Sequence, residues 1–333
     1  MTSAERLSNA ATGRVAPPPA GPSLLRLEQF KAAARGQAGS IIVTVFGDAV
    51  LPRGGRIWLG SLIGLLAPLG LGDRLVRTAV FRLVQDDWLE AVALGRRSDY
   101  RLTPAGQRRF LEASRHIYAA ESMPWDQRWR LITVTGELAP DQRERLRRAL
   151  FWHGFGQLGA DCFVHPSADL AEVFESLRSE SLTPVLSHLL PLVAANPRLP
   201  ASGQDADLVR RAWNLQDLDA AYRVFVQTYA PVLSQWRQGE ESLTDRAAFL
   251  LRSLLIHDYR RLLLRDPELP GVLLPSGWAG HEARSLCREL YGLLLPASER
   301  HLDQHFSLAD GQVPSASALL GERFDLFDSL LTV

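Results

Sequence analysis

The residues of this chain best suited to chemistry are arginines that recur on one side of a predicted helix, over residues 72–84. Guanidinium groups pair with phosphate oxygens and can bind the O6 and N7 atoms of guanine through two hydrogen bonds. The arginine side lies opposite an apolar stripe with the 3.6-residue period of a helix that packs on a core. The candidate contact residues are Arg74, Arg77, Thr78, Phe81 and Arg82. The pattern predicts a helix that contacts DNA in the major groove.

Two further helices are needed to hold this arginine-bearing helix in place. Residues 58–66 form an apolar run that Pro68 and Gly70 end, which predicts a helix followed by a tight turn. Residues 38–46 are rich in β-branched side chains and alone would indicate a strand. We expect a helix there instead, because a winged helix-turn-helix needs a first helix beneath the other two.

A hairpin with a basic tip is expected after the arginine-bearing helix. Residues 88–92 and 100–102 indicate strands, and the segment between them carries Arg96 and Arg97. Such a tip can contact phosphates or the minor groove. Residues 40–110 hold ten arginines and six acidic residues, a net charge of +4, whereas the whole chain has a net charge of +0. The positive charge is therefore concentrated where nucleic acid would bind.

Composition places the chain among ordinary globular proteins. Its 333 residues should form about two or three domains, with 46% hydrophobic and 22% charged residues. No apolar run reaches the ~18 residues of a membrane span, and residues 1–36 are expected to be a disordered tail rather than a secretory signal. Cys162 and Cys287 form no C-x-x-C motif, so no disulfide framework or zinc site is expected. These features favour a cytoplasmic protein that does not enter a membrane.

A change of pattern near Met123-Pro124-Trp125 indicates a domain boundary. Residues 125–195 then show the order βαββαβ, which predicts a small ferredoxin-like domain. The expected strands cover residues 129–135, 155–158, 162–165 and 183–190, and the expected helices cover residues 140–152 and 169–177.

Helices are expected on both sides of this middle domain, so the fold class is an α+β multidomain protein. Thr103 should cap a stalk helix that ends the winged-helix domain, residues 37–120. Residues 205–308 should form an all-α domain for effector binding and dimerisation, and residues 309–333 a tail that docks weakly. The helices expected in the all-α domain cover residues 217–230, 245–264 and 280–294.

Three motifs resemble catalytic or ligand-binding sets but lack their context. Gly154–Gly159 spells G-x-G-x-x-G, yet it follows a predicted helix and precedes a strand, the reverse of a dinucleotide fingerprint. His301 and His305 have the spacing of a metal pair, but neither a cysteine nor the glutamate of H-E-x-x-H accompanies them. Ser253 and His257 share that spacing without a G-x-S-x-G elbow or an orienting acid. We therefore expect no catalytic residues, no metal, no cofactor and no enzyme activity.

Aromatic and basic residues gather at two places in the helical domain, and two interpretations remain open. One is a bundle core with a basic edge. The other is an effector pocket, in which arginines hold a phosphate or carboxylate against an apolar floor. The candidate residues are Trp213, His257, Tyr259, Arg260, Arg261 and Trp278.

The chain resembles the PaaX family of repressors of the phenylacetic acid degradation operon, over about residues 39–295. Several ordered blocks in the N-terminal third carry the resemblance, and a second group lies near the C-terminus. The blocks are residues 45–48, 54–55, 58–63, 66–70, 77–80, 82–84 and 95–98, and then 261–270, 273–275 and Trp278.

The resemblance implies a homodimeric regulator with a winged helix, a ferredoxin-like middle domain and a helical C-terminal domain. Such a protein binds double-stranded operator DNA until the effector phenylacetyl-CoA releases it. The middle domain is also similar to a nuclease subunit of CRISPR adaptation whose first strand ends in an aspartate, where this chain has Val134-Thr135-Gly136. The alternatives are a regulator that responds to another acyl-CoA, a nuclease or thioesterase, and a DNA-architectural or partner-binding module without an effector.

Overall fold

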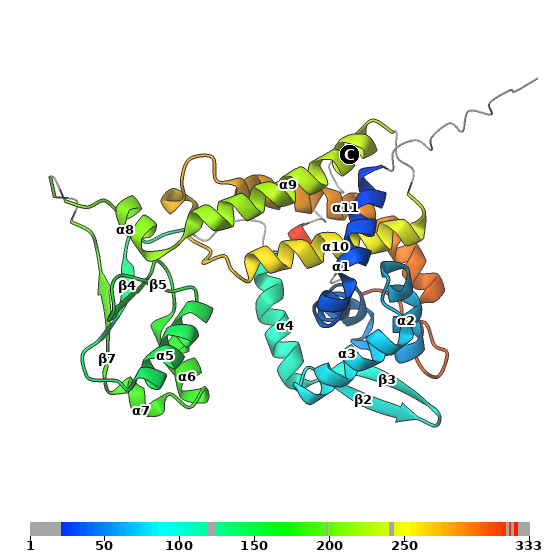
Figure 1. Ribbon diagram of the computed structural model, residues 1–333, viewed down its shortest axis with the longest axis horizontal. Coiled ribbons are helices and arrows are strands. Elements are labelled where there is room, and N and C mark those ends of the chain that lie inside the picture. The colour runs from blue at the N-terminus through cyan, green and yellow to red at the C-terminus, as the bar shows by residue number, and fades with distance from the viewer. Residues whose placement is uncertain are drawn as a thin grey trace, which may run out of the picture.

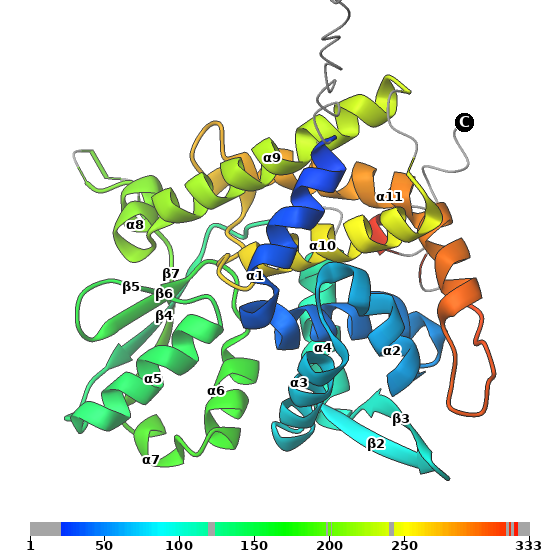
Figure 2. The same cartoon turned by 45° about the vertical axis from the view of Figure 1, so that its right-hand side comes forward.

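The computed structural model describes residues 21–118, 124–197, 199–200, 202–239, 243–317, 320 and 323–325. The protein is a mixed helix and sheet molecule, as predicted, and Figure 1 shows three parts. An N-terminal unit and a middle domain lie on the same side of long C-terminal helices, which run across both (Figures 1 and 2). No described helix combines the length and the hydropathy that a membrane crossing requires.

The N-terminal unit consists of helices packed against a small antiparallel sheet with strand order β1-β3-β2. Its helices are α1 (Pro22–Val45), α2 (Leu59–Leu66), α3 (Asp73–Gln85) and α4 (Pro104–Ile117), with short helical turns η1 (Phe46–Val50), η2 (Leu51–Arg53) and η3 (Ala67–Leu69). Its strands are β1 (Arg56–Trp58), β2 (Leu89–Leu94) and β3 (Arg97–Leu102). The expected order of three helices, a hairpin and a stalk helix is present, and the Gly106 backbone N–H donates to Thr103 Oγ1 at 2.9 Å, the cap predicted for α4.

The prediction of a disordered tail through residue 36 is wrong for residues 22–36, because they form the N-terminal part of α1. Residues 1–20 lie outside the described residues. The buried positions of α1 recur every three or four residues and include Phe30, Ala34, Ala38 and Ile41. Burial of this stripe stabilises the helix and overrides the β-branched composition of its second half.

The middle domain has the ferredoxin-like order predicted from the sequence, with sheet order β5-β6-β4-β7. Its strands are β4 (Trp129–Val134), β5 (Gly156–Gln157), β6 (Cys162–His165) and β7 (Leu189–Ala194), and its helices are α5 (Pro140–Trp152), α6 (Leu170–Ser179) and α7 (Thr183–Leu186). The strand expected over residues 183–190 is therefore misplaced. Pro184 at the first turn of α7 favours a helical turn, so that β7 begins only at Leu189.

The C-terminal helices are α8 (Asp205–Ala212), α9 (Leu215–Arg237), α10 (Asp245–Leu263) and α11 (Ala279–His305). Helix α10 is buried along almost its whole length, because α1, α9 and α11 all pack on it. Helix α11 continues through Pro296, where the sequence indicated an end. The buried residues Leu294 and Ala297 on either side of the proline hold the helix together across the lost backbone hydrogen bond.

The segment after α11 is part of the protein core rather than a weakly docked tail. Residues 306–317, which we call the C-terminal strap, lie against the N-terminal unit, and Leu308 and Ala309 are buried. Farther along, the ring of Phe324 is fully buried and packs edge-on against Tyr118 at 5.2 Å. The expectation for residues 309–333 is thus wrong for Ala309, Leu320, Arg323 and Phe324, which are buried, and Phe324 belongs to the hydrophobic cluster of the C-terminal helices.

Candidate DNA-binding surface

Helix α3 separates an apolar face from a basic one, as the sequence predicted. Its apolar face, which includes Val76 and Val80, is buried against α1. The five predicted contact residues, Arg74, Arg77, Thr78, Phe81 and Arg82, are all exposed. Phe81 is 64% exposed, so no neighbouring helix of the described chain covers its ring. The exposed face of α3 therefore offers three cations and one aromatic ring to a ligand.

Two of these side chains have partners within α3. Arg77 Nε lies 2.7 Å from Asp73 Oδ1, and both side chains are more than half exposed. An exposed ion pair of this kind contributes about 1 kcal/mol or less, so Arg77 can exchange it for a DNA contact at little cost. Thr78 is exposed, and its Oγ1 donates to the Arg74 backbone carbonyl at 2.8 Å.

The β2–β3 hairpin places Arg96 in its turn and Arg97 directly beside it, and both side chains are exposed. Leu94 pairs with Arg97 across a two-residue turn, in which Gly95 adopts a φ of 59° that disfavours other residues. Arg96 is exposed at this tip. Arg97 begins β3, and its guanidinium group lies over the Trp58 ring, 4.8 Å from the centroid. The second strand starts three residues earlier than expected, so Arg97 lies in β3 beside the turn, where it is exposed.

Behind this surface lies a buried cluster of charges that the sequence analysis missed, centred on Asp48. Asp48 is 2% exposed, and its Oδ2 accepts from Arg252 Nε at 2.7 Å. Its Oδ1 accepts from Tyr118 at 2.8 Å, from Tyr291 at 3.0 Å and from Arg323 Nη1 at 2.9 Å. Burial alone would raise the pKa of Asp48, but the two guanidinium groups hold it below its usual value.

The Asp48 cluster continues along α11. Arg252 Nη1 donates to Glu299 Oε1 at 2.5 Å, and the other oxygen of Glu299 accepts from Arg53 at 2.7 Å. Residues from η1, α10, α11 and the C-terminal segment thus share one network. The sequence feature that could have indicated this cluster is Asp48 itself, the one charged residue in the largely apolar run of residues 41–51. A carboxylate buried with such a run needs a cationic partner.

The predicted effector residues do not gather in one place. His257 is fully buried, with Nε2 at 3.0 Å from Gln37 Oε1 and Nδ1 at 3.3 Å from Thr44 Oγ1. Burial, with the neighbouring arginines, lowers the pKa of His257 to about 3, so the ring is neutral. Arg260 also faces α1, where it donates to Ser40 Oγ at 2.8 Å. These two residues therefore attach the C-terminal helices to the N-terminal unit.

The other four lie elsewhere. Tyr259 packs against Phe225 at 5.6 Å, and Trp278 packs against Tyr222 at 5.6 Å, both inside the helical core. Trp213 is half-buried and donates its indole N–H to the Gly154 carbonyl at 3.0 Å, where α8 meets the middle domain. Only Arg261 is exposed. Most of the set thus fits the first interpretation, a bundle core with a basic edge.

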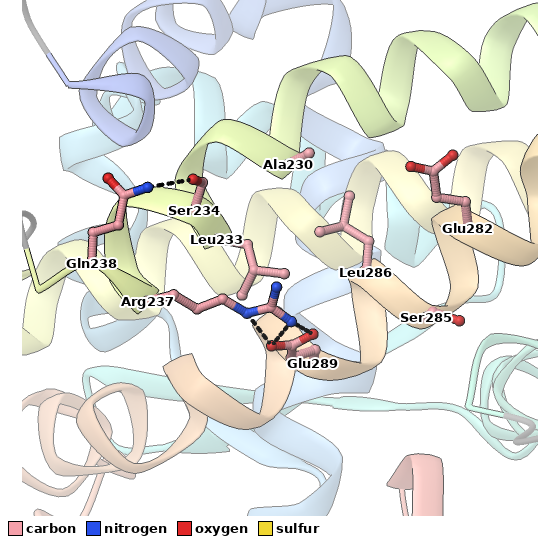
Figure 3. Close-up of a pocket in the computed structure, with 9 residues that line it drawn as sticks. All are labelled: Ala230, Leu233, Ser234, Arg237, Gln238, Glu282, Ser285, Leu286 and Glu289. Carbon is pink, nitrogen blue, oxygen red and sulfur yellow. Dashed lines mark hydrogen bonds and ion pairs between the residues drawn. The ribbon is translucent and has the colours of Figure 1, made fainter.

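A pocket of about 350 Å³ lies between α9 and α11, and none of the six predicted residues lines it (Figure 3). Leu233 and Leu286 form its apolar part. Arg237 binds Glu289 through both carboxylate oxygens, at 2.6 and 2.7 Å, and Gln238 donates to Ser234 at 3.1 Å. The complete lining is Ala230, Leu233, Ser234, Arg237, Gln238, Glu282, Ser285, Leu286 and Glu289.

The remaining motifs occupy structural positions. Gly154 and Gly159 have φ values of 77° and 80°, and the segment links α5 to β5 and β6 as a pair of turns. The rings of His301 and His305 stack at 4.3 Å in the last turns of α11, and His301 is buried. Among the residues that the structure describes, no three His, Cys, Asp or Glu side chains gather into a group that could hold a metal ion.

Comparison with known proteins gives matches along most of the chain. Family models match as PaaX-like protein at residues 37–106, PaaX protein central Cas2-like domain at residues 122–191 and PaaX-like protein C-terminal domain at residues 213–304. The Transcriptional repressor PaaX of Escherichia coli (strain K12) is 37% identical over 288 residues, 86% of this chain and 89% of that protein. Among solved structures, Uncharacterized protein Rv0674 from Mycobacterium tuberculosis covers 72% of this chain and 88% of its own, with 22% identity and a TM-score of 0.48. The chain therefore belongs to the PaaX family.

Proposed function

We propose that this protein is a transcriptional repressor that binds operator DNA through a winged helix-turn-helix formed by α2, α3 and the β2–β3 hairpin. The observation that carries the proposal is the exposed basic face of α3, which lies opposite a buried apolar face. The family model matched at residues 37–106 covers all of these elements, and the Escherichia coli relative is described as a transcriptional repressor. The repressed genes are those of phenylacetate degradation, as the family resemblance implies.

A gel-shift assay on the DNA upstream of the protein's own gene tests this function. The expected result is retardation at nanomolar protein that weakens steeply with salt, because phosphate contacts release counterions. Unrelated DNA of the same length serves as the competitor. Equal affinity for both DNAs would favour a DNA-architectural role over a repressor.

The effector in this proposal is phenylacetyl-CoA, whose phosphates suit arginine and whose aryl group suits an apolar surface. A hundredfold release from operator requires about 2.7 kcal/mol of differential affinity between the free and DNA-bound conformations. Of the predicted effector residues, Arg261 is accessible without rearrangement, since it is exposed near the end of α10. An acyl-CoA with another acyl group is the second candidate for the same chemistry.

Arg261→Ala is expected to keep operator binding and to lose the response to phenylacetyl-CoA, because a phosphate contact is removed far from α3. Calorimetry with phenylacetyl-CoA and with free phenylacetate measures binding, and gel shifts measure release. Arg237→Ala is the matched comparison, since Arg237 is an exposed arginine that lines the α9–α11 pocket. Loss of the response in Arg237→Ala but not in Arg261→Ala would place the effector in that pocket instead.

We further propose that the protein acts as a homodimer, because two reading units related by a two-fold axis match an inverted-repeat operator. The middle domain supports this, since the unpaired edge strand β7 exposes Leu190, Leu192 and Val193 to 45–55%. Light scattering at micromolar concentration is expected to give twice the 36.9 kDa of one chain. Leu192→Glu should shift the protein toward the monomer. A wild-type monomer, with or without DNA, would contradict the proposal.

A further inference from the structure

The C-terminal strap, residues 306–317, lies against the same unit that carries the hairpin. It follows directly from α11, and Figure 2 shows it as the orange loop beside α2. Phe306, Leu308 and Ala309 are at most 5% exposed, so the beginning of the strap is packed, whereas Val313 farther along is 49% exposed. The match to the PaaX-like C-terminal domain ends at residue 304, before the strap begins.

The strap first covers the edge strand of the β1-β3-β2 sheet. The Trp58 backbone N–H at the end of β1 donates to the Ser307 carbonyl at 3.1 Å. Ser61 at the start of α2 donates its hydroxyl to the His305 carbonyl at 2.8 Å and accepts the Ser307 N–H at 3.1 Å. The Ser61 hydroxyl therefore fixes the strap at the point where it leaves α11, with one hydrogen bond to each side.

The strap then holds the hairpin itself. Asp99 in β3 is 3% exposed, and its Oδ1 accepts the Ala309 N–H at 2.7 Å. Its Oδ2 lies 3.3 Å from Arg56 Nε. The Arg97 guanidinium group donates to the Ala309 carbonyl at 3.4 Å while it lies over Trp58. Both backbone polar groups of Ala309 are thus bonded to β3, close to the turn that presents Arg96.

The far part of the strap is attached to η2. Arg53 donates to the Pro314 carbonyl at 2.8 Å, and the Ser317 N–H donates to the Pro52 carbonyl at 2.8 Å. Arg53 also binds Glu299 and Asp303 of α11 at 2.7 Å each. A movement of the end of α11 would therefore displace the strap and, with it, β3.

We propose that Ser61 and Asp99 are positioning residues for DNA recognition, which act through the strap to fix the angle of the β2–β3 hairpin relative to α3. This inference rests on the proposed DNA-binding function. Both side chains are buried and contact the strap, so their effect reaches DNA through Arg96 at the hairpin tip. Between Asp99 and the turn the hairpin has only two strands, because β1 pairs with β3 no farther than Asp99. A two-stranded ribbon is marginally stable by itself, and holding it in the bound orientation reduces the entropy lost on binding.

A double-mutant cycle on operator affinity tests the proposal. Arg96→Ala is expected to weaken binding about five- to tenfold through loss of a phosphate contact. Ser61→Ala and Asp99→Ala should weaken it about as much, because the tip is no longer held in place. Adding Arg96→Ala to either variant should then lower operator affinity by less than a further twofold, because the effects of coupled residues are not additive. Asp99→Asn keeps an oxygen for the Ala309 N–H and should restore most of the affinity.

The controls separate positioning from general destabilisation. Ser179→Ala, an exposed serine-to-alanine change in the middle domain, should leave affinity unchanged, and thermal midpoints should show that each variant is folded at the assay temperature. If Asp99→Ala does not fold, the Ser61→Ala cycle decides alone. Additive losses, unchanged affinity in Ser61→Ala or no effect of Arg96→Ala would overturn the inference. A wild-type protein that fails to bind the operator would instead refute the proposed function.

Discussion

Asp48→Asn is expected to destabilise the protein by about 3–5 kcal/mol, the usual cost of removing one partner from a buried ion pair. The substitution leaves the fully buried Arg252 and the nearly buried Arg323 without the carboxylate between them. In the wild-type protein both carboxylate oxygens of Asp48 accept hydrogen bonds. The substitution replaces one of these oxygens by an NH₂ group, which would face a donor instead of accepting from it. The urea midpoint of unfolding measures the loss.

The matched control for this prediction is Asp245→Asn. Asp245 binds Arg300 at 2.8 Å, but both side chains are at least a third exposed, so the change should cost about 1 kcal/mol or less. The Asp48 cluster joins η1 to α10, α11 and Arg323, and its loss should also separate unfolding of the N-terminal unit from that of the C-terminal helices. A single unfolding transition with the wild-type midpoint in Asp48→Asn would show that the cluster does not hold these parts together.

Local periodicity was sufficient to predict the elements that pack by one face. Helix α3 alternates buried and basic positions at a strict helical period, and both faces lie as the sequence indicated. The middle domain follows the same rule, because short alternating strands and amphipathic helices occur in an order that fits few folds. Boundaries were less predictable where a proline allows two outcomes. Pro184 starts a helical turn in place of a strand, whereas Pro296 lies within a continuous helix.

Contacts between distant parts of the chain could not be predicted from local pattern. Asp48 and Arg252 are separated by 204 residues, and the local sequence around either residue does not indicate that the two form an ion pair. The same holds for His257 and Arg260, whose types suggest a ligand site, although they bind Gln37 and Ser40 of α1. An arginine beside an aromatic residue has the same sequence signature in a ligand pocket and in a domain contact. The C-terminal segment was misjudged for this reason, since its backbone groups and Arg323 bond to the N-terminal unit.

Arg77→Ala is expected to reduce operator affinity at least tenfold while the thermal midpoint of unfolding stays nearly unchanged. An arginine bound to guanine through two hydrogen bonds contributes about 1–3 kcal/mol of discrimination, whereas the exposed pair of Arg77 with Asp73 contributes little to stability. Arg82→Ala should behave in the same way, because Arg82 is exposed on the same helix face. Fluorescence anisotropy with labelled operator measures the affinity, and Arg237→Ala, an exposed and ion-paired arginine of α9, is the matched control.

The salt dependence of binding distinguishes the two contacts that Arg77 could make. If Arg77 binds a base, Arg77→Ala lowers affinity for the operator more than for unrelated DNA and leaves the slope against salt unchanged. If it binds a phosphate, affinity for all sequences falls and the slope decreases by about one counterion. Asp73→Asn supplies the opposite change, since it frees Arg77 and removes a negative charge from the α3 surface, so operator affinity should rise. Unaltered operator affinity in both Arg77→Ala and Arg82→Ala would contradict the assignment of this α3 face. Another face of the N-terminal unit would then contact DNA.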